Sequence, residues 1–256
     1  MSPALLPLLF TVSVFTEDPK VTALIVQGDA QECQHHTRAA LATFRAAEQI
    51  EPRNVGVLLR MSKQYSDLIA ETKPASQAKS IAEKSLDYAQ RALELDPKNA
   101  KAHLSLAIAY GKLTDFVGNK AKIDYSRIVH EETLKALELD PGDDFAWHVL
   151  ARWQYGVANV SGVLKALARV VYGGLPTASN EEAVKCMRKA IELAPQRMIH
   201  RTELARMYKM MHKPELAAQE WQTIIQLTAQ EKDDEKDRDE ALQELRLTSV
   251  RPPAGR

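Results

Sequence analysis

The sequence predicts an all-α fold, a right-handed solenoid of stacked helix pairs, from its proline pattern and its composition. Four similar phrases each close on a proline: AEQIEP at Pro52, ALELDP at Pro97 and again at Pro141, and AIELAP at Pro195. Proline cannot continue a helix and restricts the residue before it, so each phrase indicates a helix end. The chain is rich in Ala and Leu, holds 10 glycines in 256 residues and is 6% aromatic. That composition favours helix over sheet.

The spacing of these phrases resembles the tetratricopeptide repeat, a helix–turn–helix unit of 34 residues. The prolines are 45, 44 and 54 residues apart, so the second, third and fourth units are predicted to carry inserts. The inserts are ETKPASQAKS (71–80), TDFVGNKAKID (114–124) and SGVLKALARVVYGG (161–174). Small residues let the two helices of a unit approach closely, and large residues fill the space between units. On this register Trp147 is predicted to be buried between adjacent units.

We expect one helical-repeat domain over residues 21–248. Repeat arrays need a polar-faced terminal helix to cover the last open face, and the acidic segment 231–247 suits that role. An acidic interaction tail is the alternative for this segment. The expected divisions are an apolar tail or targeting segment 1–20, units 21–54, 55–99, 100–143, 144–197 and 198–230, a capping helix 231–247 and a disordered tail 249–256.

The N-terminal run Pro3–Phe15, PALLPLLFTVSVF, has two interpretations. It has the length of a signal-peptide core but lacks a preceding Lys or Arg, so it is either a targeting segment or a loose tail. It is too short for an ordinary membrane-spanning helix. We therefore expect no integral membrane protein. We expect a cytoplasmic protein, with association with the cytoskeleton or mitochondria as an option, and with secretion or targeting left open by this run.

The third insert is predicted to contain a helix, Ser161–Tyr172, capped by Ser161 and ended by Gly173. Apolar residues lie on nearly every side of this insert helix, and only Lys165 and Arg169 form a polar stripe along it. A helix that is apolar almost all round is normally buried. The first interpretation is a plug packed against the solenoid. The alternative is that it lines or gates an apolar cavity or touches a membrane.

Several function classes are disfavoured by what the sequence lacks. The chain has no phosphate-binding loop of the Walker type, no dinucleotide-binding glycine fingerprint and no HExxH. Cys33-x-x-His36 has metal-ligand spacing, but no second ligand pair follows at zinc-finger distance, so no metal or other cofactor is expected. Cys33 and Cys186 are expected to be packed thiols. With 34 basic and 34 acidic residues, the chain has no basic excess that would suggest nucleic acid.

Three stretches resemble the regulator of microtubule dynamics family. They are AIAYGKLTDFVGNKAKIDYSRIVHEETLKALELDP (107–141), HVLARWQYGVANVSGV (148–163) and YGGLPTASNEEA (172–183). The resemblance runs from about Val55 to Leu247, with the same inserts in the same order. It implies an all-helical, non-enzymatic domain associated with microtubules, spindle poles and mitochondria. One branch of the family tethers mitochondria to the endoplasmic reticulum through a repeat domain that binds phospholipid, and similar sequences occur in bacteria.

A binding groove is predicted on the inner face, which the first helix of each tetratricopeptide unit lines. Between Asp144 and Lys213 there are 11 Lys or Arg residues and 5 Asp or Glu residues. The predicted groove residues combine cations with aromatics and include no carboxylate: Lys63, Lys101, Phe145, His148, Arg152, Tyr155, Arg206 and Lys209.

Such a groove suits an anionic ligand that has an apolar part. Arg152 and Arg206 are the predicted anchors, because guanidinium groups bind phosphate and carboxylate bidentately. The leading hypothesis is a non-enzymatic scaffold that recognises an acidic protein segment, with tubulin as one candidate partner. The alternative is a domain that binds or transfers an anionic phospholipid through the groove and the insert helix. A solvated basic face without a ligand is the third interpretation.

Overall fold

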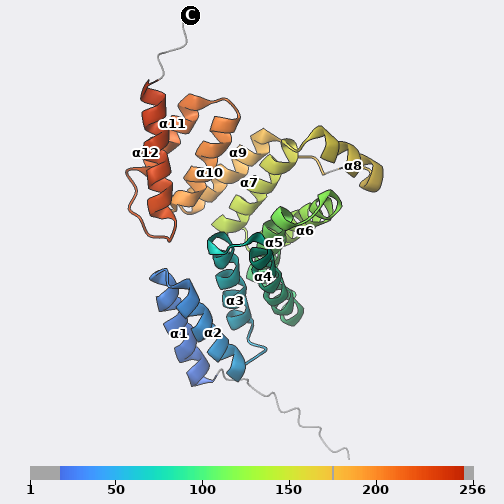
Figure 1. Cartoon of the computed structure of the whole chain (residues 1–256), viewed down its shortest axis with the longest axis vertical. Helices are drawn as coiled ribbons and strands as arrows, with labels where there is room; N and C mark the ends of the chain where they lie inside the picture. Colours follow the sequence, from blue (N-terminus) through green and yellow to red (C-terminus); the bar gives the residue numbers. More distant parts are fainter. Residues whose placement is uncertain (1–17, 175, 251–256) are drawn as a thin grey trace, which may run out of the picture.

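The computed structural model describes residues 18–174 and 176–250, and all regular secondary structure in these ranges is helical (Figure 1). The predicted all-α solenoid is confirmed. Short 3₁₀ turns, Ile69–Glu71 and Thr114–Phe116, follow the third and fifth helices. The α-helices in chain order are α1 (Pro19–Cys33), α2 (Thr37–Ile50), α3 (Val55–Leu68), α4 (Ala75–Leu95), α5 (Ala100–Leu113), α6 (Asn119–Leu139), α7 (Asp144–Ala158), α8 (Gly162–Tyr172), α9 (Asn180–Leu193), α10 (Met198–Met210), α11 (Pro214–Ile224) and α12 (Asp234–Val250).

The proline phrases mark helix ends, as predicted. Helices α2, α4, α6 and α9 each stop two residues before the proline. Two of the following helices start on an asparagine cap: Asn54 accepts a hydrogen bond from the backbone of Val57, and Asn99 accepts one from Ala102. Each cap satisfies one of the backbone N–H groups that the first helical turn leaves unpaired. A stop and a start encoded within a few residues produce the tight turns between units.

Buried alanines allow the helices to approach one another closely. Ala40, Ala92, Ala136 and Ala190 are fully buried, each on the second helix of a pair. A methyl side chain leaves room for the neighbouring helix, and dense packing of this kind provides most of the stability of a repeat array. The paired helices are α1 with α2, α3 with α4, α5 with α6, α7 with α9, and α10 with α11. Helix α8 is therefore left outside the pair of its own unit.

The first two inserts lengthen helices rather than form separate elements. Both α4 and α6 have 21 residues, and the insert sequences supply their first turns together with the preceding 3₁₀ turns. The third insert forms α8, with Ser161 accepting a hydrogen bond from Leu164 N and Gly173 in the left-handed conformation at φ 74°. The predicted caps are confirmed.

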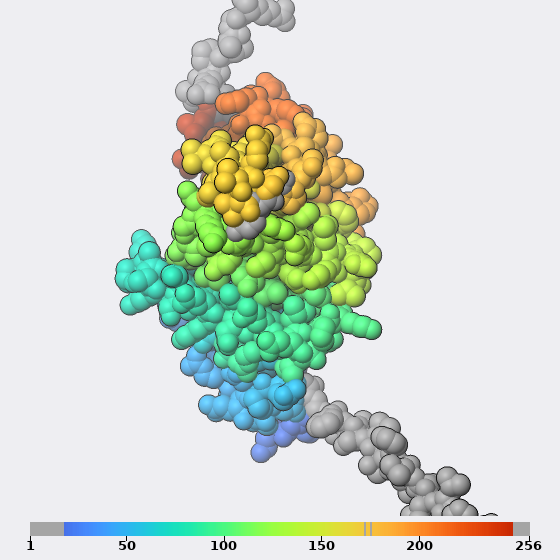
Figure 2. Space-filling view, turned by 90° about the vertical axis from the view of Figure 1, so that its right-hand side faces the viewer, coloured from blue at the N-terminus to red at the C-terminus, as the bar shows by residue number. Residues whose placement is uncertain are grey.

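The predicted burial of the insert helix as a plug is wrong. Val163 is 72% exposed and Val170 is 85% exposed, whereas Ala168 is fully buried. Helix α8 projects from the side of the molecule away from α1 and α12, and lies on its surface (Figures 1 and 2). It is displaced because α7 and α9 already pack directly against each other. No room remains between them for a third helix, so α8 keeps only one narrow side against the solenoid.

The helices follow an arc, with α1 to α3 at one end and α10 to α12 at the other (Figure 1). The loop before α12 reaches back to the first units. Lys232 Nζ donates to Thr37 Oγ1 at 3.2 Å and forms an ion pair with Glu71. This contact spans more than 160 residues of sequence and connects the two ends of the arc.

The predicted terminal segments lie almost wholly outside the described residues. Helix α1 already begins at Pro19, within the segment expected to be a tail, and α12 continues to Val250, past the expected start of the C-terminal tail. Within the described ranges, no helix is both long and apolar enough to cross a bilayer.

Candidate binding groove

The predicted groove residues lie on the first helices of four successive units. Lys63 is on α3, Lys101 on α5, four residues are on α7, and Arg206 and Lys209 are on α10. Helix α5 packs against both α3 and α7, while side-chain contacts connect α7 to α10. The structure therefore brings these positions together along one series of neighbouring helices.

Carboxylates are present at this surface, so the expectation of an uncompensated basic groove is wrong. Lys63 Nζ lies 2.9 Å from Glu32 and 2.8 Å from Asp67. Lys101 Nζ lies 2.8 Å from Asp143, the residue that caps the start of α7. Desolvation alone would lower the pKa of Lys63, but the two carboxylates reverse that effect and raise it.

A carboxylate of the chain itself occupies the position between the two predicted anchors. Glu203 lies 3.4 Å from Nε of Arg152 and 3.5 Å from Nη1 of Arg206. Arg206 also forms a two-pronged ion pair with Glu240 of α12, with its Nε 2.9 Å from one carboxylate oxygen. Arg206 is thus engaged inside the protein, which makes it a poor primary anchor for a ligand.

The capping helix supplies acids that the sequence interpretation did not assign to the groove. Glu244 pairs with Lys209 at 2.6 Å, and Asp237 lies 3.6 Å from Arg206. Burial outweighs that arginine and raises the pKa of Asp237 to about 6. A usable signal existed in the sequence. Residues 237, 240 and 244 fall on one face of α12. Arg206 and Lys209 fall on one face of α10, three residues apart, so the two helical faces can pair.

The ion pairs are layered, with cations outside and carboxylates beneath. The Lys101 side chain is 63% exposed above Asp143, which is 1% exposed. The Arg152 side chain is 59% exposed above Glu203, which is 18% exposed. The contact with Glu203 is made through Nε of Arg152, while the Arg152 side chain as a whole stays 59% exposed to solvent. The exposed charge layer is therefore positive, although the local net charge is offset.

His148 lies in the core rather than in the groove, which corrects its predicted role. It is 3% exposed, and its Nδ1 is 2.9 Å from Nδ1 of fully buried His200. Nε2 of His200 donates to Asp144 at 2.7 Å. In a neutral His200 this places the proton on Nε2, so Nδ1 accepts a hydrogen bond from His148. The chain Asp144–His200–His148 connects α7 with α10.

The two remaining predicted aromatics, Phe145 and Tyr155, are partly buried on α7. The Phe145 ring stacks on His148 with centroids 5.2 Å apart, and the Arg197 guanidinium lies 5.8 Å from the Phe145 centroid. Tyr155 is also partly buried, and its pKa is raised by desolvation and by Glu203. Phe145 thus packs directly against the histidine of the polar chain.

Acidification is expected to destabilise the protein through the buried histidines. Burial lowers the pKa of both His148 and His200, and Arg152 and Arg197 add to the effect on His148. As pH falls through about 6.5, the unfolded chain takes up protons that the folded chain does not. Stability should therefore fall from pH 7 to pH 5. Denaturant titrations at several pH values measure this slope.

The matched comparison is His148→Gln, which removes one titrating group. Its stability should depend less steeply on pH over the same range. Asp237 acts in the opposite direction, because a folded-state pKa raised to about 6 favours the folded state as pH falls. Since Asp237 is present in both proteins, its contribution cancels in the comparison. Equal slopes would show that the histidine pair does not control the acid response.

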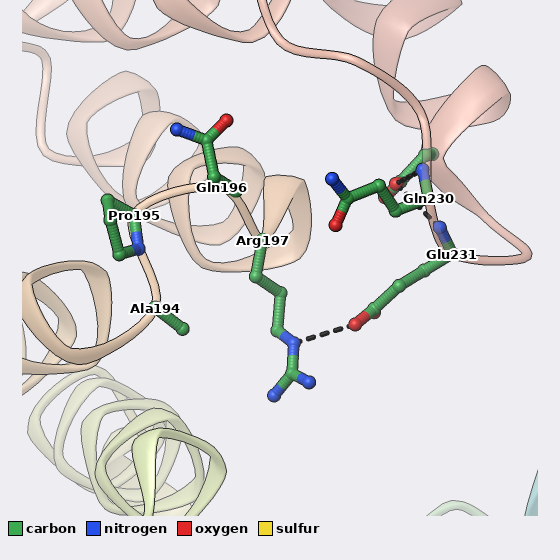
Figure 3. Close-up of a pocket in the computed structure, with 7 residues that line it drawn as sticks. Ala194, Pro195, Gln196, Arg197, Gln230 and Glu231 are labelled. Carbon is green, nitrogen blue, oxygen red and sulfur yellow. Dashed lines mark hydrogen bonds and ion pairs between the residues drawn. The ribbon is translucent and has the colours of Figure 1, made fainter.

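A pocket of about 190 Å³ lies between the α9–α10 turn and the loop before α12 (Figure 3). Arg197 points across it toward Glu231, with Nε 2.7 Å from the carboxylate, and also contacts Asp144 at 2.5 Å. The side chain of Arg197 is therefore already paired with two carboxylates of the protein itself. We assign the pocket a structural role.

The cysteines and acids do not form a metal centre in the part of the chain that the structure describes. Cys186 is buried and its pKa is raised to about 11 by desolvation, so its thiol stays protonated and unreactive. Cys33 is exposed, which corrects the expectation that both thiols are packed. It lies at the end of α1, where the helix meets solvent.

Comparison with known proteins identifies similar sequences over most of the chain. A sequence model described as Regulator of microtubule dynamics protein 1-3 matches residues 24–249. The chain is 33% identical to regulator of microtubule dynamics protein 3 of Xenopus laevis over 138 residues, 54% of this chain and 30% of the relative. It is 29% identical to protein 1 of Bos taurus over 170 residues, 66% of this chain and 54% of the relative. The matches thus span about half or less of these relatives.

Solved structures support the fold. A thermophilic tetratricopeptide-repeat protein from Thermus thermophilus superposes with a TM-score of 0.66 at 15% identity, covering 88% of this chain and 98% of that one. A tetratricopeptide-repeat protein from Parabacteroides merdae gives a TM-score of 0.53 at 14% identity, with 90% and 77% covered. At these identities the likeness concerns architecture only.

Proposed function

Since the chain belongs to the regulator of microtubule dynamics family, we propose that it is a non-enzymatic scaffold that binds an acidic protein segment at the cytoskeleton. The acidic tails of tubulin are the partner that best fits the family's name. The binding surface in this proposal is the groove lined by α3, α5, α7 and α10. The proposed anchors are Lys101 and Arg152, in place of the predicted anchors Arg152 and Arg206.

The observation that carries this proposal is the layered arrangement of charge. Lys101 and Arg152 are held in place by more deeply buried carboxylates while their own side chains are more than half exposed. A fixed cation loses less conformational entropy when it binds an anion than a freely moving one does. The exposed guanidinium of Arg152 offers N–H donors in the fork that carboxylates accept bidentately.

The double variant Lys101→Gln/Arg152→Gln is expected to weaken binding to microtubules and to a Glu-rich peptide by about tenfold or more. A charge-assisted hydrogen bond contributes roughly 1.5–3 kcal/mol, and about 1.4 kcal/mol corresponds to tenfold in affinity. Added salt should weaken the wild type more than the variant, because fewer charges remain to be screened. Microtubule co-sedimentation and peptide titration at two salt concentrations measure these effects.

The matched control is Lys185→Gln/Lys189→Gln on α9. It removes the same charge from exposed lysines that pair only with nearby acids of their own helix. If the control weakens binding as much as the groove variant, net charge rather than the groove controls the interaction. If neither variant changes affinity, the groove is not the binding surface.

A second candidate function, contact with an anionic phospholipid surface, is favoured by one specific observation. Helix α8 exposes Val163 and Val170 on one side and Lys165 and Arg169 on another. This is the pattern of helices that lie in a membrane interface. Flotation with anionic liposomes is the additional arm of the same experiment. Retained flotation after Val163→Ser/Val170→Ser would count against this candidate.

A further inference from the structure

A second pocket, of about 300 Å³, lies between α8 and the end of α7. Lys165 and Arg169 of α8 form one wall, and Val157 and Ala158 of α7 form the opposite wall. Pro176 lines the pocket from the segment that leads to α9. This α8 pocket lies outside the proposed groove, and nothing in the proposed scaffold function requires it. Its volume is at the lower end of the range of small-molecule sites.

The two cations of the α8 pocket differ from every predicted groove cation. Lys63, Lys101, Arg152, Arg206 and Lys209 are all paired with carboxylates. By contrast, the region from Phe145 to Asn180 contains no Asp or Glu. Lys165 Nζ donates to the carbonyl of Ala158 at 3.2 Å, and neither Lys165 nor Arg169 forms an ion pair within the described ranges.

The helix ends beside the pocket do not neutralise this charge. Both α7 and α8 end near the pocket, at Ala158 and Tyr172, and a helix C-terminus carries about half a negative charge. Two full cations against two such ends leave a net charge of about +1. Lys165 also has three ammonium donors, of which the Ala158 carbonyl uses one. The pocket therefore retains both positive charge and unused donors.

We propose that the α8 pocket binds the anionic end of a ligand, a carboxylate or a phosphate, between Lys165 and Arg169. Residues four apart on a helix are neighbours on its surface, so both side chains can reach one anion. The uncharged part of the ligand packs against Val157 and Pro176.

Nuclear magnetic resonance titration of the full chain tests this site. Sodium phosphate and sodium succinate are the probes, added at constant ionic strength with sodium chloride as the balance. The backbone amides of Gly173 and Gly174, which line the pocket, should shift along saturating curves. In Lys165→Gln/Arg169→Gln the apparent affinity should fall at least tenfold. The swap Lys165→Arg/Arg169→Lys keeps both charges and should retain saturable binding.

The groove variant Lys101→Gln/Arg152→Gln separates this site from the proposed scaffold function. It should bind both probes at the α8 pocket like the wild type, even if microtubule binding is lost. Tighter binding of phosphate would support a phosphorylated ligand, and tighter binding of succinate would support an acidic side chain or chain terminus. Linear, non-saturating shifts in the wild type, or equal saturation in the Gln double variant, would overturn the proposal. Retained nuclear Overhauser contacts between α8 and α6, which pack against each other, establish that α8 stays docked in each variant without probe.

Discussion

Trp153→Ala is expected to lower the free energy of unfolding by about 3–5 kcal/mol. Trp153 is 6% exposed in the largest core cluster, and its ring stacks on His130 with centroids 3.8 Å apart. Its indole N–H donates to the carbonyl of Ser126 at 2.8 Å, which ties α7 to α6. The substitution leaves a cavity and removes the hydrogen bond between α7 and α6. Denaturant unfolding followed by circular dichroism measures the loss.

Trp147→Ala is the matched comparison, and its cost should be clearly smaller. Trp147 is only partly buried, and its indole N–H donates to the Pro141 carbonyl at an exposed position. The same side chain is thus removed from the same helix with less packing lost. The repeat register predicts that Trp147 is buried between adjacent units, whereas the structure leaves it only partly buried. Equal losses for the two variants would show that the packing described for α7 is incorrect.

Gly28→Ala should also destabilise the protein, by about 1–3 kcal/mol, although alanine is the better helix former. A Cβ at position 28 would lie 2.2 Å from Cε1 of Phe44, and two further ring atoms lie within 2.7 Å. Phe44 is fully buried, so its ring cannot move into solvent. The gain in helix propensity is at most about 1 kcal/mol. The steric conflict is expected to exceed it, and thermal unfolding would show the net loss.

Two controls accompany this substitution. Gly111→Ala should be neutral or stabilising, because its Cβ would be 4.0 Å from the nearest atom, in Val129. Phe44→Leu added to Gly28→Ala should recover part of the loss, since a smaller side chain makes room for the new methyl group. A Gly28→Ala protein as stable as the wild type would refute the close approach of α1 and α2.

The helix ends could be predicted because their signals are local. Proline and the capping residues Asn54 and Asn99 act within one turn of where they stand. The ranking of Trp147 and Trp153 could not be predicted in the same way. They are six positions apart, so they point in different directions from one helix, and burial depends on where α6 and α9 pack. The exposure of α8 likewise depends on the direct contact of α7 with α9.

The residue types of the groove could be predicted, but their pairing could not. The first-helix rule predicts the helices that carry Lys101 and Arg152, but it does not predict that Glu203 lies between Arg152 and Arg206. Glu203 lies on the same helix as Arg206, three residues away, so this pair was visible as a helical spacing. The contact of His148 with His200 had no such signal. Those residues are 52 positions apart and meet only after two units stack.

The Lys232 contact gives the molecule a mechanical property. A repeat array in which each unit contacts only its neighbours can bend along its length, because small rotations at every junction add up. The ion pair between Lys232 and Glu71 links the two ends of the repeat array, and both side chains are about a third or more exposed. An ion pair at such exposure contributes about 0–1 kcal/mol, comparable with thermal energy. Added salt is therefore expected to weaken this link between the two ends of the arc, and with it the restraint on bending of the repeat array.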